Sequence, residues 1–179
     1  MKQTLLVTLI IAVIALASQF GLGIAVPDLP DGTIISTDSD VVSFVEKHKD
    51  KECLVVDKDK HLLYYVRNGR LVKNFPVPIA IGMGGFYKTP SGEFKIDGKN
   101  PNSRFTKFLK LNIPYSIAPY GIHAGPTYLA KKYEKLELQY PGERFVTKKD
   151  DTRGCVAVET SVMRYLFERI EEETPVLIL

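Results

Sequence analysis

The sequence predicts a mostly-β fold, either a sandwich or a barrel, with a few peripheral helices. Three observations support this class. Short β-prone runs follow one another from Cys53 onward, turn signals separate them at close intervals, and helical spacing is confined to short segments. The 179 residues suffice for one ordinary domain with a real core, and no internal repeat is visible.

The N-terminal residues 1–25 are predicted to be a secretory signal peptide. Lys2 precedes an apolar run from Leu5 to Ala17 that only Thr8 interrupts, and small residues near Ala17 and Ala25 offer cleavage positions. The alternative is an uncleaved N-terminal membrane anchor, because this segment is just long enough to span a bilayer. Either reading places the folded part outside the cytoplasm, in the periplasm or the cell wall.

Residues 26–50 are predicted to form a linker followed by a short helix. Two prolines and a glycine between residues 26 and 38 are typical of a linker. Asp38 or Ser39 can cap a helix that ends at Lys47. Its expected apolar face consists of Val41, Val42 and Val45. A continuing loop is the alternative.

The first predicted strands are Cys53–Asp57 and Leu62–Val66. Asn68-Gly69 then gives a strong signal for a two-residue hairpin, because both residues tolerate the positive φ of a type I′ turn. We expect Arg70–Phe75 to return as the partner strand.

Strands and turns alternate through the middle of the chain. Pro76 and Pro78 are expected to push the segment that follows them to a sheet edge or a bend. Asp97–Arg104 is predicted to be a turn-rich loop. The further predicted strands are Ile79–Gly82, Glu93–Ile96, Phe108–Ile113 and Gly121–His123.

The C-terminal third mixes helical and extended patterns. Thr127–Lys149 has imperfect helical spacing and is predicted to be a partly helical insertion, either a lid beside a site or a plain surface helix. Thr160 can cap a helix that runs to Glu171, and Val176–Leu179 closes the chain as a buried strand. The residues expected to face inward from this helix are Val162, Met163, Leu166, Phe167 and Ile170.

Charge and residue counts exclude several classes of function. The formal net charge is only +3 and the basic residues are scattered, so no nucleic-acid partner is predicted. The chain has three histidines and neither a Cys-x-x-Cys nor a His-x-x-x-His pattern, so neither a metal nor another cofactor is expected. We expect a monomer.

The stretch Asp151–Val158 carries the clearest candidate for chemistry. Cys155 follows Arg153 and Gly154 and enters a short apolar run. A reactive cysteine acts as its thiolate, which positive neighbours and solvent access favour. Gly154 leaves room for a substrate carbonyl and frees backbone N–H groups to bind an oxyanion. The alternative is a small, buried, inert cysteine.

His123 is the candidate base. It lies between glycines in Gly121–Gly125, at the expected end of a strand, where its ring can face a cleft. A neutral imidazole can take a thiol proton near neutral pH. A purely structural histidine is the alternative. His48 and His61 have charged, exposed-looking neighbours and are not expected to take part.

Cys53 complicates this prediction. Two cysteines in an oxidising compartment can form a disulfide, and a bond between Cys53 and Cys155 would remove the nucleophile. We interpret Cys53 as a partly buried strand residue that stays free.

Several ordered blocks resemble the L,D-transpeptidase catalytic-domain family, over nearly all of residues 53–179. These blocks are the Val55-Val56-Asp57 hairpin, Thr89–Phe94, Asp97–Ser103, Gly121-Ile122-His123, Thr152–Val156 and Thr174-Pro175-Val176. The resemblance implies a mostly-β catalytic domain over residues 51–179, a cysteine nucleophile and a histidine base. These roles fall on Cys155 and His123.

The resemblance also suggests roles for the neighbouring residues. Gly154 would supply an oxyanion-binding backbone N–H, and the Ala124 carbonyl would orient the histidine ring. Arg153, Thr152 and Gly125 are candidates for substrate binding, although Arg153 would otherwise form a surface ion pair and Thr152 would otherwise shape the turn.

The chain departs from the commonest family pattern in ways that mark a branch. Many members carry Ser/Thr-His-Gly-Cys and an Arg or Asn two residues after the cysteine, where this chain has Arg153 and Ala157. The form Gly-Cys-Val-Ala-Val defines the branch. His123 is followed by Ala124-Gly125 rather than directly by glycine.

The implied reaction acts on stem peptides of peptidoglycan. Cys155 and His123 would be held as a thiolate–imidazolium pair, and the sulfur would attack the carbonyl at the L-centre of the third-position diamino acid. The terminal D-amino acid would leave, and an amine of a neighbouring stem would form the cross-link. Alternatives are hydrolysis of the same type of bond, by a carboxypeptidase or amidase, and a non-catalytic wall-binding module.

Overall fold

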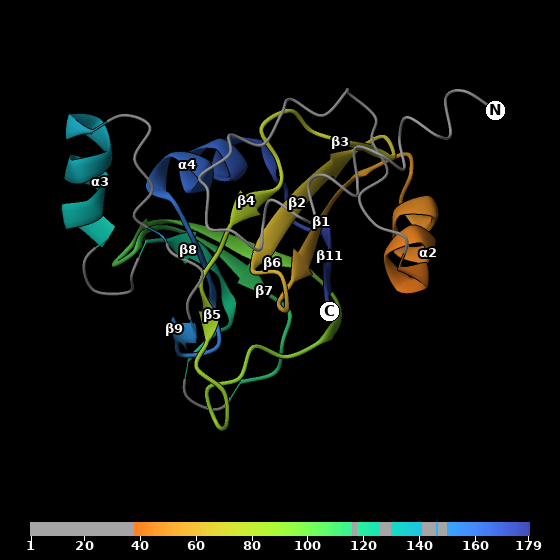
Figure 1. The fold of residues 1–179 in the computed structure, drawn as a ribbon, viewed down its shortest axis with the longest axis horizontal. Coiled ribbons are helices and arrows are strands. Elements are labelled where there is room, and N and C mark those ends of the chain that lie inside the picture. The colour runs from red at the N-terminus through yellow and green to blue at the C-terminus, as the bar shows by residue number, and fades with distance from the viewer. Residues whose placement is uncertain (1–37, 116–117, 126–129, 141–145, 147–149) are drawn as a thin grey trace, which may run out of the picture. The chain divides into compact units, whose positions relative to one another are not determined.

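The computed structural model describes residues 38–115, 118–125, 130–140, 146 and 150–179 (Figure 1). The predicted signal peptide or anchor and the linker up to residue 37 lie outside these residues. No helix within the described ranges is long and apolar enough to cross a membrane.

One mixed sheet of nine strands carries the fold, and the predicted mostly-β class is confirmed. Its order is β10-β8-β7-β6-β11-β1-β2-β3, and β4 also pairs with β2. A separate parallel pair joins β5 to β9. The strands are β1 Glu52–Asp57, β2 Leu62–Arg67, β3 Arg70–Leu71, β4 Val77–Pro78, β5 Ile81–Gly82, β6 Gly92–Ser103, β7 Thr106–Leu111, β8 Gly121–Ala124, β9 Asp150–Thr152, β10 Val156–Val158 and β11 Pro175–Ile178.

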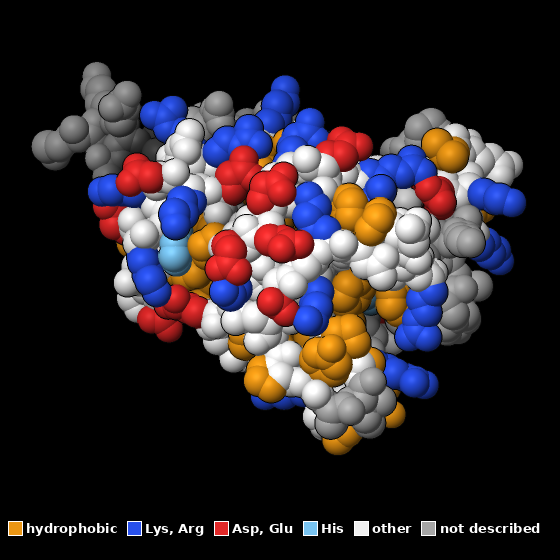
Figure 2. Space-filling view, turned by 180° about the vertical axis from the view of Figure 1, so that it is seen from behind, with side chains coloured by type: hydrophobic (Ala, Val, Ile, Leu, Met, Phe, Trp, Pro, Cys, Tyr) orange, Lys and Arg blue, Asp and Glu red, His pale blue; other side chains and the backbone are white. Residues whose placement is uncertain are grey.

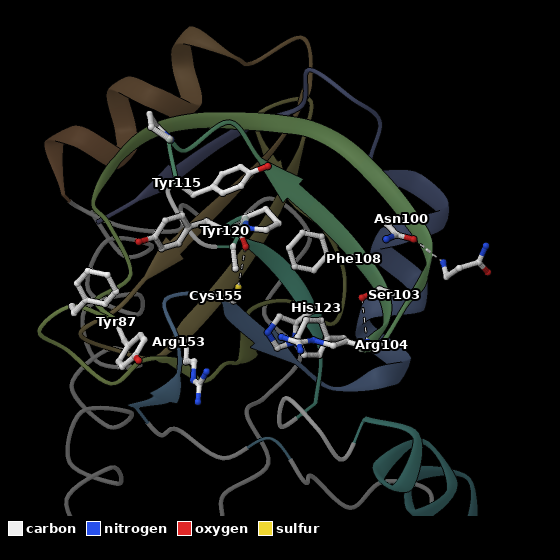
Figure 3. Close-up of a pocket in the computed structure, with 16 residues that line it drawn as sticks. Tyr87, Asn100, Ser103, Arg104, Phe108, Tyr115, Tyr120, His123, Arg153 and Cys155 are labelled. Carbon is white, nitrogen blue, oxygen red and sulfur yellow. Dashed lines mark hydrogen bonds between the residues drawn. The ribbon is translucent and has the colours of Figure 1, made fainter.

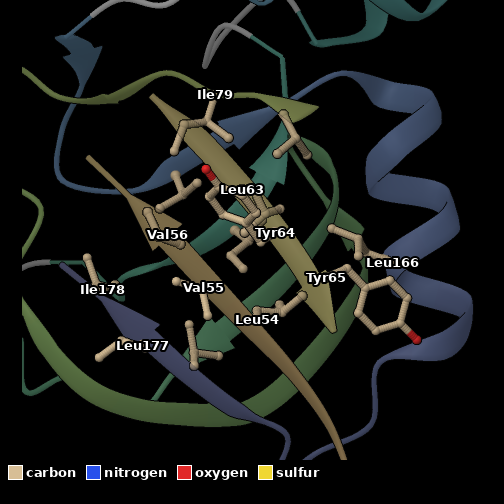
Figure 4. Packing of buried hydrophobic residues seen from close by; sticks show 14 of the residues in the cluster. Leu54, Val55, Val56, Leu63, Tyr64, Tyr65, Ile79, Leu166, Leu177 and Ile178 are labelled. Atoms are coloured by element: carbon tan, nitrogen blue, oxygen red, sulfur yellow. The ribbon is translucent and has the colours of Figure 1, made fainter. Parts of the chain in front are cut away.

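The core lies around β1, β2 and β11, whose apolar side chains pack together (Figure 4). Strand β1 is buried from Cys53 to Asp57, as expected for a central strand covered on both faces. Cys53 is 0% exposed and both cysteines are free, so the alternative of a disulfide is not seen. The expected partial burial of Cys53 was an underestimate, because its strand runs through the middle of the sheet.

Helix α2, Ser39–Lys47, begins and ends where the sequence predicts. The Asp38 carboxylate accepts a hydrogen bond from the Asp40 backbone N–H at 2.9 Å and caps it. Its buried face differs from the prediction: Val41 and Phe44 enter the core, whereas Val42 is 47% exposed.

The C-terminal helices support each other through polar contacts. Helix α4, Thr160–Arg169, buries Met163 and Leu166 as predicted, and it ends before the expected Glu171. Its N-terminus is capped by Glu137 of helix α3, Ala130–Gln139. The Glu137 carboxylate accepts hydrogen bonds from the backbone N–H groups of Thr160 at 2.7 Å and Ser161 at 2.9 Å. Glu134 of α3 also pairs with Arg164 of α4.

The predicted turn-rich loop Asp97–Arg104 is wrong. Strand β6 continues to Ser103 and pairs with β7, and only its tip turns, at Arg104-Phe105. The pairing shifts register between Ile96 and Gly98 and again between Asn100 and Ser103. These irregularities absorb the turn-prone residues and bend the hairpin without ending it.

Candidate active site

Strand pairing brings the two candidate catalytic residues to one side of the sheet. Strands β8 and β10 are parallel, with His123 opposite Ala157. Cys155 lies two residues before Ala157, just outside β10, and side chains two apart in extended chain point the same way. His123 and Cys155 both line one pocket of about 670 Å³ (Figure 3).

His123 is held by two phenylalanine rings. The Phe105 ring stacks on the imidazole at 4.3 Å between centroids and 18° between planes, and Phe108, its cross-strand partner on β7, lies at 6.3 Å and 11°. Nδ1 lies 3.2 Å from the Ala124 carbonyl oxygen. A carbonyl only accepts, so Nδ1 carries the proton and Nε2 is left as an acceptor. Nε2 is buried and has no hydrogen-bond partner among the described residues.

Burial favours the neutral form of His123. The ring is 0% exposed, and the loss of solvation lowers its pKa to about 4, with a smaller contribution from the charge of Arg104. The hydrogen bond to Ala124 acts in the opposite direction. At neutral pH the imidazole is therefore uncharged and able to accept a proton.

Cys155 is half-buried, and its Sγ lies 3.8 Å from the Pro119 carbonyl oxygen, to which the thiol donates. Burial raises the thiol pKa, while the Gly121 backbone N–H and the charge of Arg104 lower it. The directions of the pKa shifts at Cys155 and His123 do not favour the expected thiolate–imidazolium pair. Burial opposes the charged form of each group, because it raises the pKa of the Cys155 thiol and lowers that of the His123 imidazole.

The turn before Cys155 is fixed by Thr152 and Gly154. Thr152 is 1% exposed, and its hydroxyl donates to the Cys155 carbonyl at 2.6 Å. Gly154 has φ 98°, and a Cβ there would lie 2.5 Å from Tyr120 Cε1. Thr152 therefore shapes the turn and does not line the pocket, and position 154 requires glycine.

A second glycine joins this turn to the neighbouring loop. A Cβ on Gly82 would lie 2.0 Å from the Tyr87 carbonyl oxygen and 2.9 Å from Gly154 Cα. Gly82 N–H also donates to the Thr89 hydroxyl at 2.8 Å. The backbone of the loop that carries Phe86 and Tyr87 is thus in direct contact with the turn that carries the thiol.

The remaining predicted site residues divide into two groups. Arg153 lines the pocket, with its guanidinium carbon 5.6 Å from the Tyr87 ring centroid. Ala124 and Gly125 are buried behind the pocket, and the Gly125 N–H donates to the Val158 carbonyl at 2.7 Å. The sheet therefore uses the backbone donor of Gly125, which does not reach a ligand in this pocket.

Most of the pocket wall consists of residues for which the sequence predicted no role. Arg104 and Phe105 come from the β6–β7 tip that was expected to be an ordinary loop. The block Asp97–Ser103 contributes to the family resemblance, but no functional role was predicted for it. Its last residues lead into this tip. The other aromatic wall residues are Phe86, Tyr87, Phe108, Tyr115 and Tyr120.

No residue of helix α3 that the structure describes lines the pocket; this helix belongs to the segment interpreted as either a lid or a surface helix. The described part of the insertion packs against α4 through Glu134 and Glu137. The described residues therefore agree with the surface-helix alternative. Residues 126–129, 141–145 and 147–149 lie outside the described ranges.

A partly exposed thiol and a buried neutral imidazole that share one pocket are the arrangement of a cysteine-dependent acyl-transfer enzyme. Comparison with known families agrees with this class. The sequence model of the L,D-transpeptidase catalytic domain (YkuD) matches residues 51–178. The chain belongs to this family. A comparison with curated proteins gives no match.

Solved structures share the fold at low sequence identity. The chain is similar to L,D-transpeptidase 3 from Mycobacterium tuberculosis in complex with a faropenem-derived adduct, with 12% identity, TM-score 0.51, and coverage of 71% of this chain and 59% of that one. Bd1075 from Bdellovibrio bacteriovorus has 22% identity and a TM-score of 0.50, and the match covers 73% of this chain and 47% of that one. An L,D-transpeptidase from Mycobacterium smegmatis has 14% identity and a TM-score of 0.49, and the match covers 72% of this chain and 58% of that one. The chain thus spans only about half to three fifths of the length of these proteins.

Proposed function

We propose that this domain is a peptidoglycan-modifying cysteine acyltransferase that carries out L,D-transpeptidation. One observation carries the proposal: His123 Nε2 is a buried acceptor with no hydrogen-bond partner among the described residues, and His123 lines the same pocket as Cys155. Buried polar atoms are normally satisfied, so an exception calls for a functional explanation. Membership in the L,D-transpeptidase family supports the same conclusion.

In the proposed first half-reaction, the Cys155 side chain turns from the Pro119 carbonyl toward His123 Nε2. The imidazole takes the thiol proton as the sulfur attacks the carbonyl at the L-centre of the third-position diamino acid. The S–C bond forms, the C–N bond to the terminal D-amino acid breaks, and His123 returns the proton to the leaving amine. The lowered pKa of His123 keeps the ring neutral and ready for this step.

In the second half-reaction, an amine of a neighbouring stem peptide attacks the thioester. An amide bond forms, the C–S bond breaks, and the thiol is regenerated. Backbone N–H groups of Gly154 and Cys155 would bind the oxyanion in both halves. Each such donor contributes roughly 2.7–4 kcal/mol in comparable sites. The left-handed Gly154, with φ 98°, sets the orientation of these groups.

The place of action follows from the substrate and the N-terminus. Peptidoglycan lies outside the cytoplasm, and the apolar run Leu5–Ala17 behind Lys2 is suited to export. We therefore place the domain in the periplasm or the cell wall, either released after cleavage near residue 25 or held by residues 1–25 as an anchor.

The decisive experiment is incubation of the purified chain with disaccharide-tetrapeptide muropeptides, with the products identified by mass. We expect a cross-linked dimer that has lost one terminal D-amino acid. Cys155→Ala should give no product, and Cys53→Ala, which removes the other thiol, should keep the wild-type yield.

Each alternative has its own signature in this assay. If the assay gives tripeptide and no dimer, the reaction is hydrolysis and not transpeptidation. Absence of both products would favour a non-catalytic wall-binding module. Faropenem offers a substrate-independent check, because a relative from M. tuberculosis carries a faropenem-derived adduct. An adduct on this chain that persists in Cys155→Ala would exclude Cys155 as the nucleophile.

A further inference from the structure

The tip of the β6–β7 hairpin forms one wall of the pocket. Its two turn residues are Arg104 and Phe105, between the paired residues Ser103 and Thr106. Phe105 stacks on His123 at 4.3 Å, and the guanidinium carbon of Arg104 lies 4.7 Å from the centroid of the Phe105 ring. Arg104 is exposed and lies beside His123 in Figure 3.

Arg104 is the charged side chain of this tip, and it lines the pocket. The Asn100 side-chain oxygen accepts from the Asn102 N–H at 2.9 Å, and the Ser103 hydroxyl accepts from the Phe105 N–H at 3.2 Å. Both side chains thus stabilise the hairpin itself. Arg104 forms neither a hydrogen bond nor a salt bridge with any residue that the structure describes; arginine salt bridges there involve Arg67, Arg164 and Arg169.

The pocket as a whole is suited to a negatively charged ligand. Two arginines, Arg104 and Arg153, line it, and its lining contains no Asp or Glu among the described residues. Figure 3 shows Arg153 well apart from Arg104 along the pocket. Arg104 also lowers the pKa of both Cys155 and His123 by its charge, which places its field at the reacting pair.

The hairpin that carries Arg104 is anchored to α4. The ammonium groups of Lys99 and Lys107 lie 5.1 Å and 4.5 Å from the centroid of the Phe167 ring. Two cation–π contacts from neighbouring strands hold the base of the hairpin against the helix. A guanidinium on an anchored hairpin presents its donors at a defined place, which favours recognition of a planar anion.

We propose that Arg104 recognises a carboxylate of the acyl donor. This inference rests on the proposed function, because the donor is taken to be a stem peptide. Such a donor ends in the α-carboxylate of its terminal residue, next to the scissile bond. A third-position diamino acid with a side-chain carboxylate offers a second one. Both are the same chemistry, a planar carboxylate that can accept two hydrogen bonds from a guanidinium.

The test compares Arg104→Gln, Arg104→Lys and the wild-type chain on four tetrapeptide donors. One donor is unmodified, one has its terminal carboxylate amidated, one has the side-chain carboxylate amidated, and one has both amidated. Lys73→Gln is the matched control, because it removes one exposed positive charge outside both the pocket and the hairpin.

On the unmodified donor, Arg104→Gln should raise KM by about 10- to 100-fold, because a hydrogen bond to a charged group is lost from ground state and transition state alike. The KM of Arg104→Lys should lie between those of the wild type and Arg104→Gln, because lysine keeps the positive charge but loses the planar pair of N–H donors. On the doubly amidated donor, wild type and Arg104→Gln should have the same kcat/KM. The single amidation that abolishes the difference identifies the carboxylate.

Three outcomes would overturn the inference and leave the proposed function in place. Equal kinetics of Arg104→Gln and wild type on the unmodified donor would show that Arg104 binds no carboxylate. An equal loss on all four donors would assign Arg104 a structural role through Phe105. A similar loss in Lys73→Gln would mean that the effect comes from the overall charge of the protein. A wild-type chain that converts none of the donors would overturn the proposed function, and this inference with it.

Discussion

The two cysteines of this domain have opposite surroundings. Cys53 lies in β1, is 0% exposed, and burial raises its pKa to about 12. Cys155 lies before β10, lines a pocket, and has the Gly121 N–H and the charge of Arg104 working against the effect of burial. The same side chain is thus inert in one place and accessible in the other.

The sheet explains this difference. Strand β1 is central, with β11 on one side and β2 on the other. Strand β10 ends the strand order: it pairs with β8 on one side, and on the other it has only an isolated bridge between Ala157 and Ala80. A chain that enters an edge strand can turn sharply just before it, as at Gly154. An edge position therefore allows a thiol to be both anchored by a sheet and open to a ligand.

The largest predicted contrast is in thiol alkylation. In the native protein, iodoacetamide should modify Cys155 on the order of 10⁴-fold faster than Cys53 or more, because Cys53 reacts only after an opening that costs several kcal/mol. Peptide mass analysis at increasing times measures both rates. Because the pKa of the Cys155 thiol is raised, its alkylation rate should continue to increase with pH beyond the range in which an ordinary cysteine titrates. Comparable rates at the two cysteines would contradict the comparison.

The second largest effect is expected from removing His123, the proposed base. His123→Ala is expected to reduce kcat/KM for the tetrapeptide by about 10²- to 10⁴-fold, the usual contribution of general-base catalysis. His48→Ala, at the end of α2 and outside the pocket, is the matched control.

The pH profile of the wild-type chain tests the same residue. Since the pKa of His123 is lowered to about 4, the ring stays neutral as the pH falls from 7. The acid limb of kcat/KM should lie near that value and be missing in His123→Ala. A limb near the ordinary histidine value would mean that a less buried group is the base.

The smallest predicted effect concerns stability. Cys53→Ser places a hydroxyl in an apolar core site and should lower the free energy of unfolding by about 1–3 kcal/mol. Cys155→Ser, at a half-buried position, should change it by less than about 0.5 kcal/mol. Urea unfolding followed by circular dichroism measures both. Equal losses would mean that the two sites are packed alike.

Local signals in the sequence were sufficient for much of the fold. Asn68-Gly69 predicted the hairpin between β2 and β3, and φ is 51° and 71° at the two residues. Asp38 predicted the start of α2. The pattern failed at β6, where Gly98 and Pro101 suggested turns, because the register shifts that accommodate them depend on the partner strand β7.

The candidate site was predictable only in part, for the same reason. Cys155 and His123 stand in short blocks that carry their own chemical signal. No local pattern indicates that Phe105 stacks on His123, because this contact depends on the register of β7 against β8. No local pattern indicates either that Glu137 of α3 caps helix α4. Burial of the histidine, which decides its charge, is likewise a property of the whole sheet.

The contact between Gly82 and Gly154 has a consequence for engineering. Because the two backbones touch, the loop that carries Phe86 and Tyr87 cannot be exchanged for that of a relative without displacing the segment that bears the sulfur. A graft intended to change which peptides enter must therefore transplant both segments together, from the same donor, as a single block.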